Sequence, residues 1–149
     1  MENEITKQSK RIAEFKGYEY IPYDPDSVLK PGWWMKNTPK NYGKKGSAST
    51  KFSNLYFLCR RHGELRYYNE WNWLMPVVEI IESIYDEYHG YFAVYISSNS
   101  CSIQGTKLTP EKADVYYSQF YRDTKREATF LAVVDFIDWY NTNLKNKLL

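Results

Sequence analysis

The most regular hydrophobic pattern of the chain lies between Asn69 and Tyr85. Apolar side chains recur there at spacings of three and four residues, which is the period of an α-helix with one buried side. The pattern predicts a helix that begins between residues 69 and 73, with Asn69 or Asn72 as its N-cap. Pro76 favours the later start, because proline removes a hydrogen bond deeper in a helix. The predicted apolar stripe consists of Trp71, Leu74, Met75, Val78, Ile81 and Tyr85.

A helix is also predicted near each end of the chain. The first covers Glu2 to Lys16, and Gly17 follows it as a residue that can adopt the left-handed backbone conformation. The last opens at Asp123 or Thr124 and runs to about Leu144.

The last helix is apolar on two sides, which indicates deeper burial than that of a surface helix. Either the helix sits centrally, or one of its apolar sides forms a self-association surface. Phe136 and Trp139 are the candidate residues for that surface.

The clearest strand is Tyr91–Ser97, which is rich in aromatic and β-branched residues. Asn99 and Ser100 form a credible two-residue turn, and Cys101–Gln104 would return antiparallel to the first strand. Residues 107–121 are ambiguous between a short helical turn and an ordered loop. Weaker strand patterns lie at 17–23, 33–35 and 52–60.

Together these elements predict one domain, because 149 residues match the usual size of a single domain with its own core. The predicted fold class is α+β, arranged as an α/β/α sandwich with a mainly antiparallel sheet flanked by helices. Residues 36–51 are rich in Lys, Asn, Gly and Ser, so we expect a long mobile basic loop there.

Charge is distributed unevenly, although the net charge is only +2. Residues 1–66 hold 13 Lys and Arg against 7 Asp and Glu, whereas residues 67–149 hold 7 against 11. Within residues 30–66, 9 basic residues accompany a single acid, Glu64. Such a segment attracts polyanions.

Aromatic residues are interleaved with this basic segment, which suggests binding to single-stranded nucleic acid. Cations give salt-dependent attraction to phosphate, and aromatic rings can stack on unpaired bases. The alternative is a solvated basic loop above a buried tryptophan pair, and the pI of about 8.4 is low for a dedicated nucleic-acid-binding domain. The candidate nucleic-acid surface consists of Trp33, Trp34, Lys36, Lys44, Lys45, Arg60 and Arg61.

Tyrosine is unusually frequent, with 15 residues in the chain. Tyrosine gives contact area without full burial, as protein interfaces often do. The alternative is that these rings lie at the boundary of the core.

The sequence predicts a cytoplasmic protein. Its first ten residues lack the apolar segment of a signal peptide, and no run approaches the roughly 18 apolar residues of a membrane span. Two cysteines are too few for a disulfide framework and suit a reducing compartment.

Residues that could carry chemistry are few. Cys59, His62, His89 and Cys101 could in principle bind zinc, but their spacing is unlike that of a zinc knuckle. Cys59, His62 and Glu64 could form a nucleophilic site only if the cysteine and histidine lay side by side. We therefore predict no catalytic residue, no metal and no cofactor.

Several segments resemble a known family in the same order along the chain. They are Asn69–Glu79, Tyr95–Ile96, Cys101–Ile103 and Glu127–Ile137, and they resemble the small prophage and mobile-element proteins of the phage α-β-α sandwich domain. The resemblance covers roughly residues 65–142. It implies a sheet between helical layers, and it implies no established reaction and no cofactor.

The resulting functional hypothesis is a non-enzymatic accessory protein of a phage-related element that acts through protein contacts, either as a homodimer or with another protein. Weak, sequence-tolerant binding of single-stranded nucleic acid through residues 30–66 is the alternative hypothesis, and an enzyme is a third.

Overall fold

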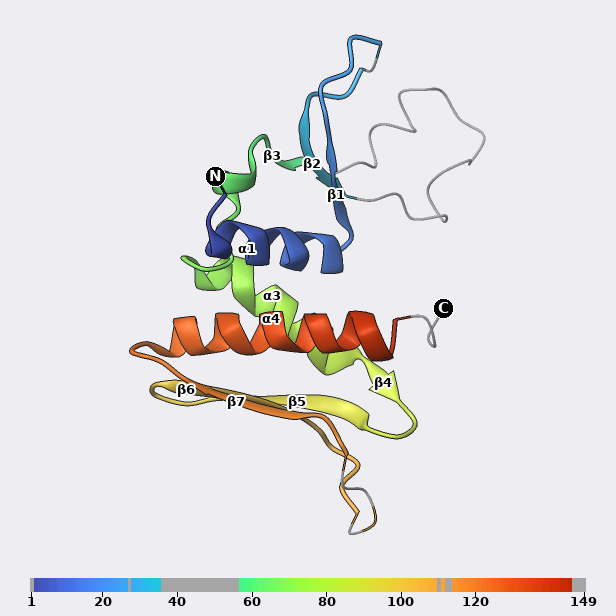
Figure 1. The fold of residues 1–149 in the computed structure, drawn as a ribbon, viewed down its shortest axis with the longest axis vertical. Coiled ribbons are helices and arrows are strands. Elements are labelled where there is room, and N and C mark those ends of the chain that lie inside the picture. The colour runs from blue at the N-terminus through green and yellow to red at the C-terminus, as the bar shows by residue number, and fades with distance from the viewer. Residues whose placement is uncertain (1, 27, 36–56, 110, 112–113, 146–149) are drawn as a thin grey trace. The chain divides into compact units, whose positions relative to one another are not determined.

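The computed structural model describes residues 2–26, 28–35, 57–109, 111 and 114–145 (Figure 1). Contacts divide the chain into two compact units, Met1–Leu65 and Arg66–Leu149. The units are called the N-terminal unit and the C-terminal unit below.

The N-terminal unit begins with helix α1, Glu4–Phe15, as the sequence pattern predicted. Asn3 caps the helix, because its side-chain oxygen accepts a 2.8 Å hydrogen bond from the backbone N–H of Thr6. Gly17 follows with φ +98° and turns the chain into the first strand. An antiparallel sheet in the order β1-β2-β3 then forms from Tyr18–Ile21, Gly32–Met35 and Phe57–Cys59, and the 3-10 helix η1 covers His62–Glu64.

The C-terminal unit packs two helices on a second antiparallel sheet, whose strand order is β4-β5-β6-β7. The two helices are α3, Trp71–Ser83, and α4, Lys125–Asn143. The strands are Tyr85–Asp86, Gly90–Ile96, Ser100–Gly105 and Tyr117–Tyr121.

Helix α3 starts at Trp71, within the predicted interval, but its cap differs from the prediction. Glu70 holds the N-cap position and makes no side-chain capping hydrogen bond, so neither Asn69 nor Asn72 is the cap. The helix continues through Pro76. Its buried residues are Leu74, Val77, Val78 and Ile81, whereas the predicted stripe members Met75 and Tyr85 are exposed.

Helix α4 is the central element of its unit. The Thr124 hydroxyl accepts a 3.2 Å hydrogen bond from the backbone N–H of Glu127, which caps the first turn. α4 contacts β6, β7 and α3, so both apolar sides of the helix are covered. The buried residues are Ala128, Thr129, Phe130, Ala132, Val133, Val134, Phe136 and Ile137.

The predicted hairpin is confirmed, but one strand of the sheet was missed. β5 and β6 pair antiparallel with Val94 opposite Ile103, close to the predicted strand limits. Residues 117–121, predicted to be helical turn or loop, form strand β7 instead. They do so because pairing with β6 satisfies the backbone groups of every second residue, which local propensity does not report.

The α+β class with antiparallel sheets and packed helices is confirmed. In the C-terminal unit, α4 packs on β6 and β7 and α3 packs on β5, while the opposite face of the sheet carries exposed side chains. Among the described residues of this unit, no second helical layer covers that face. None of the described helices is long and apolar enough to cross a membrane.

Candidate functional site

The two faces of the C-terminal sheet differ sharply in burial. Residues that stand opposite each other in neighbouring strands point to the same face, and successive residues alternate between faces. Phe92, Ile103 and Cys101 are buried on the helix side. The other face carries Tyr91 and Tyr95 of β5, and both are more than half exposed.

We call this second face the tyrosine face. The register places Ala93 opposite Gln104 and Tyr117, and Tyr95 opposite Ser102 and Gln119. Strands β5, β6 and β7 contain no Asp, Glu, Lys or Arg. The tyrosine face therefore consists of Tyr85, Tyr91, Ala93, Tyr95, Ser102, Gln104, Tyr117, Gln119 and Tyr121.

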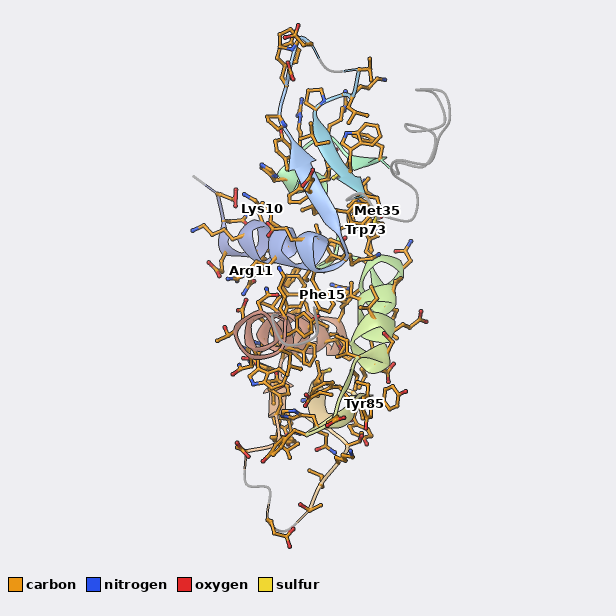
Figure 2. The ribbon with its side chains drawn as sticks, turned by 90° about the vertical axis from the view of Figure 1, so that its right-hand side faces the viewer. Lys10, Arg11, Phe15, Met35, Trp73 and Tyr85 are labelled. Atoms are coloured by element: carbon orange, nitrogen blue, oxygen red, sulfur yellow. The ribbon has the colours of Figure 1, made fainter. Side chains whose placement is uncertain are left out.

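One end of the tyrosine face is fixed by β4. Tyr85 stands opposite Tyr91, and their rings meet edge to face with centroids 5.1 Å apart. Lys107 Nζ donates hydrogen bonds to the Tyr85 hydroxyl, at 3.2 Å, and to the Glu87 carbonyl, at 2.9 Å. Figure 2 shows the Tyr85 side chain at the outside of the C-terminal unit, beside the end of α3. These contacts hold an exposed aromatic pair in place.

Strand β7 forms the opposite edge of the sheet. The Gly105 N–H donates to the Tyr116 carbonyl, and the Arg122 N–H donates to the Asn99 carbonyl. Because hydrogen-bonded residues alternate along an antiparallel ladder, the backbone groups of Tyr117, Gln119 and Tyr121 face the outer edge. No other described strand of this unit pairs with that edge.

This edge is unusual in its chemistry. Natural proteins protect long edge strands with charges, prolines or bulges. β7 has the sequence Tyr-Ser-Gln-Phe-Tyr and none of these devices. Tyr117 and Tyr121 are 58% and 59% exposed, so the edge is accessible from the tyrosine face.

The predicted self-association residues lie elsewhere. Phe136 is fully buried, with its ring centroid 5.0 Å from that of Phe92, so its place on an exposed surface was wrong. Trp139 is half-buried and packs 4.6 Å from Tyr116. The sequence left open whether the second apolar side of α4 is buried or forms an interface, because the sheet that covers it could not be foreseen from the helix alone.

The predicted nucleic-acid surface is only partly described. Trp33 is 1% exposed, and its indole N–H donates to His62 Nδ1 at 3.1 Å, so its role as a base-stacking platform was wrong. Trp34 is half-buried against Phe57. Arg60 and Arg61 are exposed, whereas Lys36, Lys44 and Lys45 lie outside the described residues.

The cysteines have the chemistry of buried thiols. Burial, followed by the charge of Glu64, raises the pKa of Cys59 to about 11, and burial raises the pKa of Cys101 to about 11. Both are protonated at neutral pH and are poor nucleophiles. The Cys59 thiol donates to the Arg61 carbonyl at 3.4 Å, and not to the His62 ring.

Metal-ligating residues do not gather in the described parts of the chain. No group of three or more His, Cys, Asp or Glu side chains among them has the geometry to hold an ion. His62 accepts from Trp33 instead, and His89 Nδ1 lies 2.6 Å from Asp86 Oδ2.

Sequence reasoning missed the tyrosine face, although part of the signal was present. Tyr95 lies four positions after Tyr91, and Tyr121 lies four positions after Tyr117. Such spacing places each pair on one face of a strand. The pattern needed the strand assignment of residues 117–121 before it could be interpreted.

No family model, curated protein or solved structure matches this chain. The resemblance to the phage α-β-α sandwich domain therefore stays a prediction.

Proposed function

We propose that the protein is a non-enzymatic accessory protein that acts through protein–protein contacts, and that the tyrosine face is its contact surface. The observation that carries this proposal is the uncharged face, which ends in an unprotected edge strand. Tyrosine, serine and glutamine supply broad contact area and adaptable hydrogen bonds. No charge on these strands has to be desolvated when a partner binds.

The charge of the C-terminal unit favours protein over nucleic acid as the partner of this face. Residues 66–149 hold 8 Lys and Arg against 11 Asp and Glu, which gives a negative net charge. Binding to nucleic acid depends on cations that neutralise phosphates. Strands β5, β6 and β7 supply none.

The first partner in this proposal is a second copy of the chain. Two β7 strands can pair antiparallel about a two-fold axis at Gln119, which places Tyr117 of one copy opposite Tyr121 of the other. Aromatic cross-strand pairs of this kind stabilise a sheet by about 0.2–1 kcal/mol each. Edge pairing also satisfies the outward backbone groups of Gln119 in both copies.

The assembled sheet would present one continuous tyrosine face to a further protein. The setting that we propose, a phage-related or mobile element in the cytoplasm, comes from the sequence resemblance and the cysteine usage.

The test is the mass of the protein in solution. The chain has a mass of 17.8 kDa, and we expect sedimentation equilibrium to give about twice that value for the wild type. Gln119→Lys should return the protein to the monomer mass, because two lysines would then meet at the two-fold axis. Ser102→Lys is the matched control, since Ser102 stands opposite Gln119 on the same face but in the central strand β6.

The two variants distinguish a dimer that forms at the β7 edge from one that forms across the face of the sheet. If Gln119→Lys is monomeric and Ser102→Lys stays dimeric, the copies meet at the edge. A wild-type protein that stays monomeric at high micromolar concentration would overturn the dimer. Circular dichroism should show that both variants keep the wild-type helix and strand content.

A second candidate function is single-strand binding by the N-terminal unit. The observation that favours it is the pair of exposed guanidinium groups of Arg60 and Arg61 at the end of β3. We expect a fluorescent single-stranded oligonucleotide to bind more weakly at about 200 mM than at about 50 mM salt. Arg60→Glu with Arg61→Glu should remove that binding, whereas Arg122→Glu, an exposed site in the other unit, should not. No binding at the lower salt concentration would retire this candidate.

A further inference from the structure

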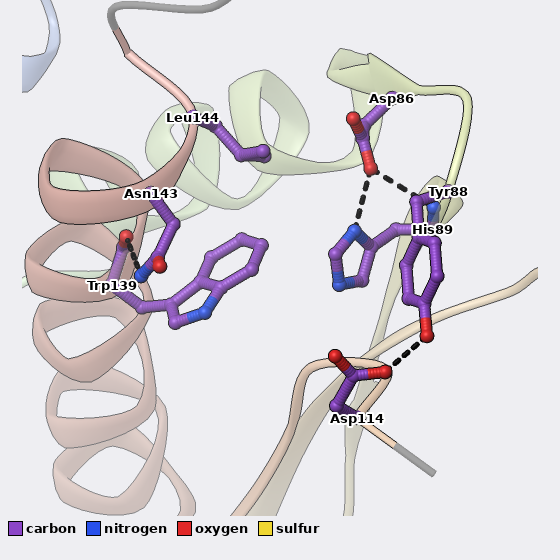
Figure 3. A pocket seen from close by; sticks show the side chains of 7 residues that line it. All are labelled: Asp86, Tyr88, His89, Asp114, Trp139, Asn143 and Leu144. Atoms are coloured by element: carbon purple, nitrogen blue, oxygen red, sulfur yellow. Dashed lines mark hydrogen bonds and ion pairs between the residues drawn. The ribbon is translucent and has the colours of Figure 1, made fainter. Parts of the chain in front are cut away.

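The C-terminal unit contains a pocket of about 300 Å³ that no part of the tyrosine face uses (Figure 3). It lies between the β4–β5 turn, the segment that leads into β7 and the C-terminal end of α4. The polar and aromatic residues that line it are Asp86, Tyr88, His89, Asp114, Trp139 and Asn143, with Leu144 at its side.

Asp86 fixes the orientation and the proton of His89. One carboxylate oxygen, Oδ2, lies 2.6 Å from His89 Nδ1 and 3.0 Å from the backbone nitrogen of His89. A carboxylate can only accept, so Nδ1 carries a proton. In the neutral ring, Nε2 is then a hydrogen-bond acceptor.

Within the part of the chain that the structure describes, Nε2 has no hydrogen-bond donor. His89 is 7% exposed, and its Nε2 is buried without a hydrogen-bond partner among the described residues. Figure 3 shows Nε2 on the side of Trp139 and Asp114, away from Asp86. A buried acceptor without a partner costs free energy, which a ligand with an N–H or O–H group would recover.

Two further groups of the pocket are acceptors, while the Tyr88 hydroxyl and the Trp139 indole N–H are donors. The Asp114 carboxylate accepts from the Tyr88 hydroxyl. Asn143 Nδ2 donates to the Trp139 carbonyl at 2.9 Å, which leaves the Asn143 side-chain oxygen as an acceptor. Among the described residues that line the pocket there is no lysine or arginine, and two carboxylates are present, those of Asp86 and Asp114.

Trp139 adds an aromatic wall. Its ring meets that of His89 edge to face, with centroids 5.0 Å apart. The face of an indole ring attracts cations through its quadrupole. Acceptors, negative charge and an aromatic wall together match a small organic cation.

We propose that this pocket binds an alkylammonium or guanidinium group, which donates to His89 Nε2 and to the Asp114 carboxylate and rests against the Trp139 ring. The volume is at the lower end of the range for ligand pockets. It therefore suits a small free amine or a single lysine or arginine side chain of another protein.

The first experiment uses n-butylammonium and n-butylguanidinium chloride with the full chain. Binding is followed by NMR through the indole N–H signal of Trp139, which the Trp139→Phe variant assigns. Sodium butyrate and n-butanol have the same alkyl chain without the cation. We expect saturable shifts with the two cations, and shifts at least tenfold smaller at equal concentration with butyrate and butanol.

A second arm distinguishes a free amine from a side chain. The capped peptides Gly-Lys-Gly and Gly-Arg-Gly are titrated beside the two small cations. Tighter binding of a peptide assigns the pocket to a protein side chain, and tighter binding of the small cations assigns it to a free amine.

Asp114→Asn should weaken cation binding at least tenfold. Glu79→Gln is the matched control, because it removes the same charge from an exposed position on α3 and should leave the affinity unchanged. The Asp114→Asn variant should keep the wild-type NMR spectrum outside the pocket.

Two results would overturn the proposal. One is equal or stronger binding of butyrate, or no saturable binding of any cation. The other is a nitrogen NMR spectrum in which both ring nitrogens of His89 carry protons at neutral pH, because Nε2 would then repel the cation.

Discussion

At the residue scale, His89 stabilises the charged form of the Asp86 carboxyl. Burial works to raise the pKa of the Asp86 carboxyl, but the hydrogen bonds from the side chain and backbone of His89 outweigh it and hold the pKa below the usual 3.8. The folded state therefore binds the proton of Asp86 more weakly than the unfolded state. Its contribution to stability is present above about pH 3.8 and is lost as the pH falls through the folded value.

We predict that Asp86→Asn lowers the urea midpoint of unfolding at neutral pH. The difference from the wild type should shrink steadily below about pH 3.8, because the wild-type carboxyl is then protonated as well. Urea titrations at several pH values provide the measurement. A difference that stays constant down to strongly acidic pH would show that the charge of Asp86 is not the cause.

Also at the residue scale, the hydrogen bond between Trp33 and His62 pins the N-terminal sheet to η1. The Trp33 indole N–H is buried and donates to His62 Nδ1 at 3.1 Å. We predict that His62→Phe costs about 1–3 kcal/mol of unfolding free energy, because the buried donor loses its acceptor. His62→Gln should cost less if its amide oxygen takes over as acceptor, and chemical denaturation followed by tryptophan fluorescence compares the two.

The buried thiols give a chemical prediction at the same scale. Because the pKa of Cys59 and that of Cys101 are both raised to about 11, little thiolate exists at neutral pH. We expect iodoacetamide to label both cysteines at least tenfold more slowly in the folded protein than in urea. Fast labelling of either cysteine without denaturant would contradict the burial that the structure gives it.

At the element scale, helix α4 contributes to the core with both of its apolar sides, because both are covered. Phe136 packs against Phe92 with centroids 5.0 Å apart, so its side chain belongs to the core. We predict that Phe136→Ala costs about 3–5 kcal/mol of unfolding free energy. Asn141→Ala, an exposed position on the same helix, should change stability by about 0.5 kcal/mol or less.

A charged residue at position 136 tests the folding of α4 and not an interface, because Phe136 is buried. Phe136→Glu would bury an unpaired carboxylate, which costs far more than a lost surface contact. We therefore expect loss of the folded state, not a change of mass in a folded protein. A folded Phe136→Glu protein with altered mass would restore the interface hypothesis.

At the scale of the whole molecule, the two compact units each have their own sheet and helices. We predict that a fragment of residues 66–149 folds by itself, because its core forms from α3, α4 and β5–β7. Amide NMR dispersion and a cooperative thermal transition are the measurements. An unfolded fragment would instead support the single cooperative domain expected from the length of the chain.

Local sequence signals were enough to locate the helices and one hairpin and to give the fold class. The period of three and four residues located α1, α3 and α4, since each helix needs only its own apolar pattern and local caps. The alternation and turn residues at 91–104 located the β5–β6 hairpin, because its partners are adjacent in sequence. The α+β class followed from these elements.

Only the tertiary structure decided which apolar side chains are buried and which are exposed at a surface. Phe136 and Trp33 carry the signatures of contact residues, and the sheet and η1 cover them through contacts distant in sequence. Strand β7 exists because β6 pairs with it, and that pairing places Tyr117 and Tyr121 on the same face as the exposed tyrosines of β4 and β5. The His89 pocket joins three separate segments in the same way. Burial depends on what lies opposite a residue in space, and a local pattern does not contain that information.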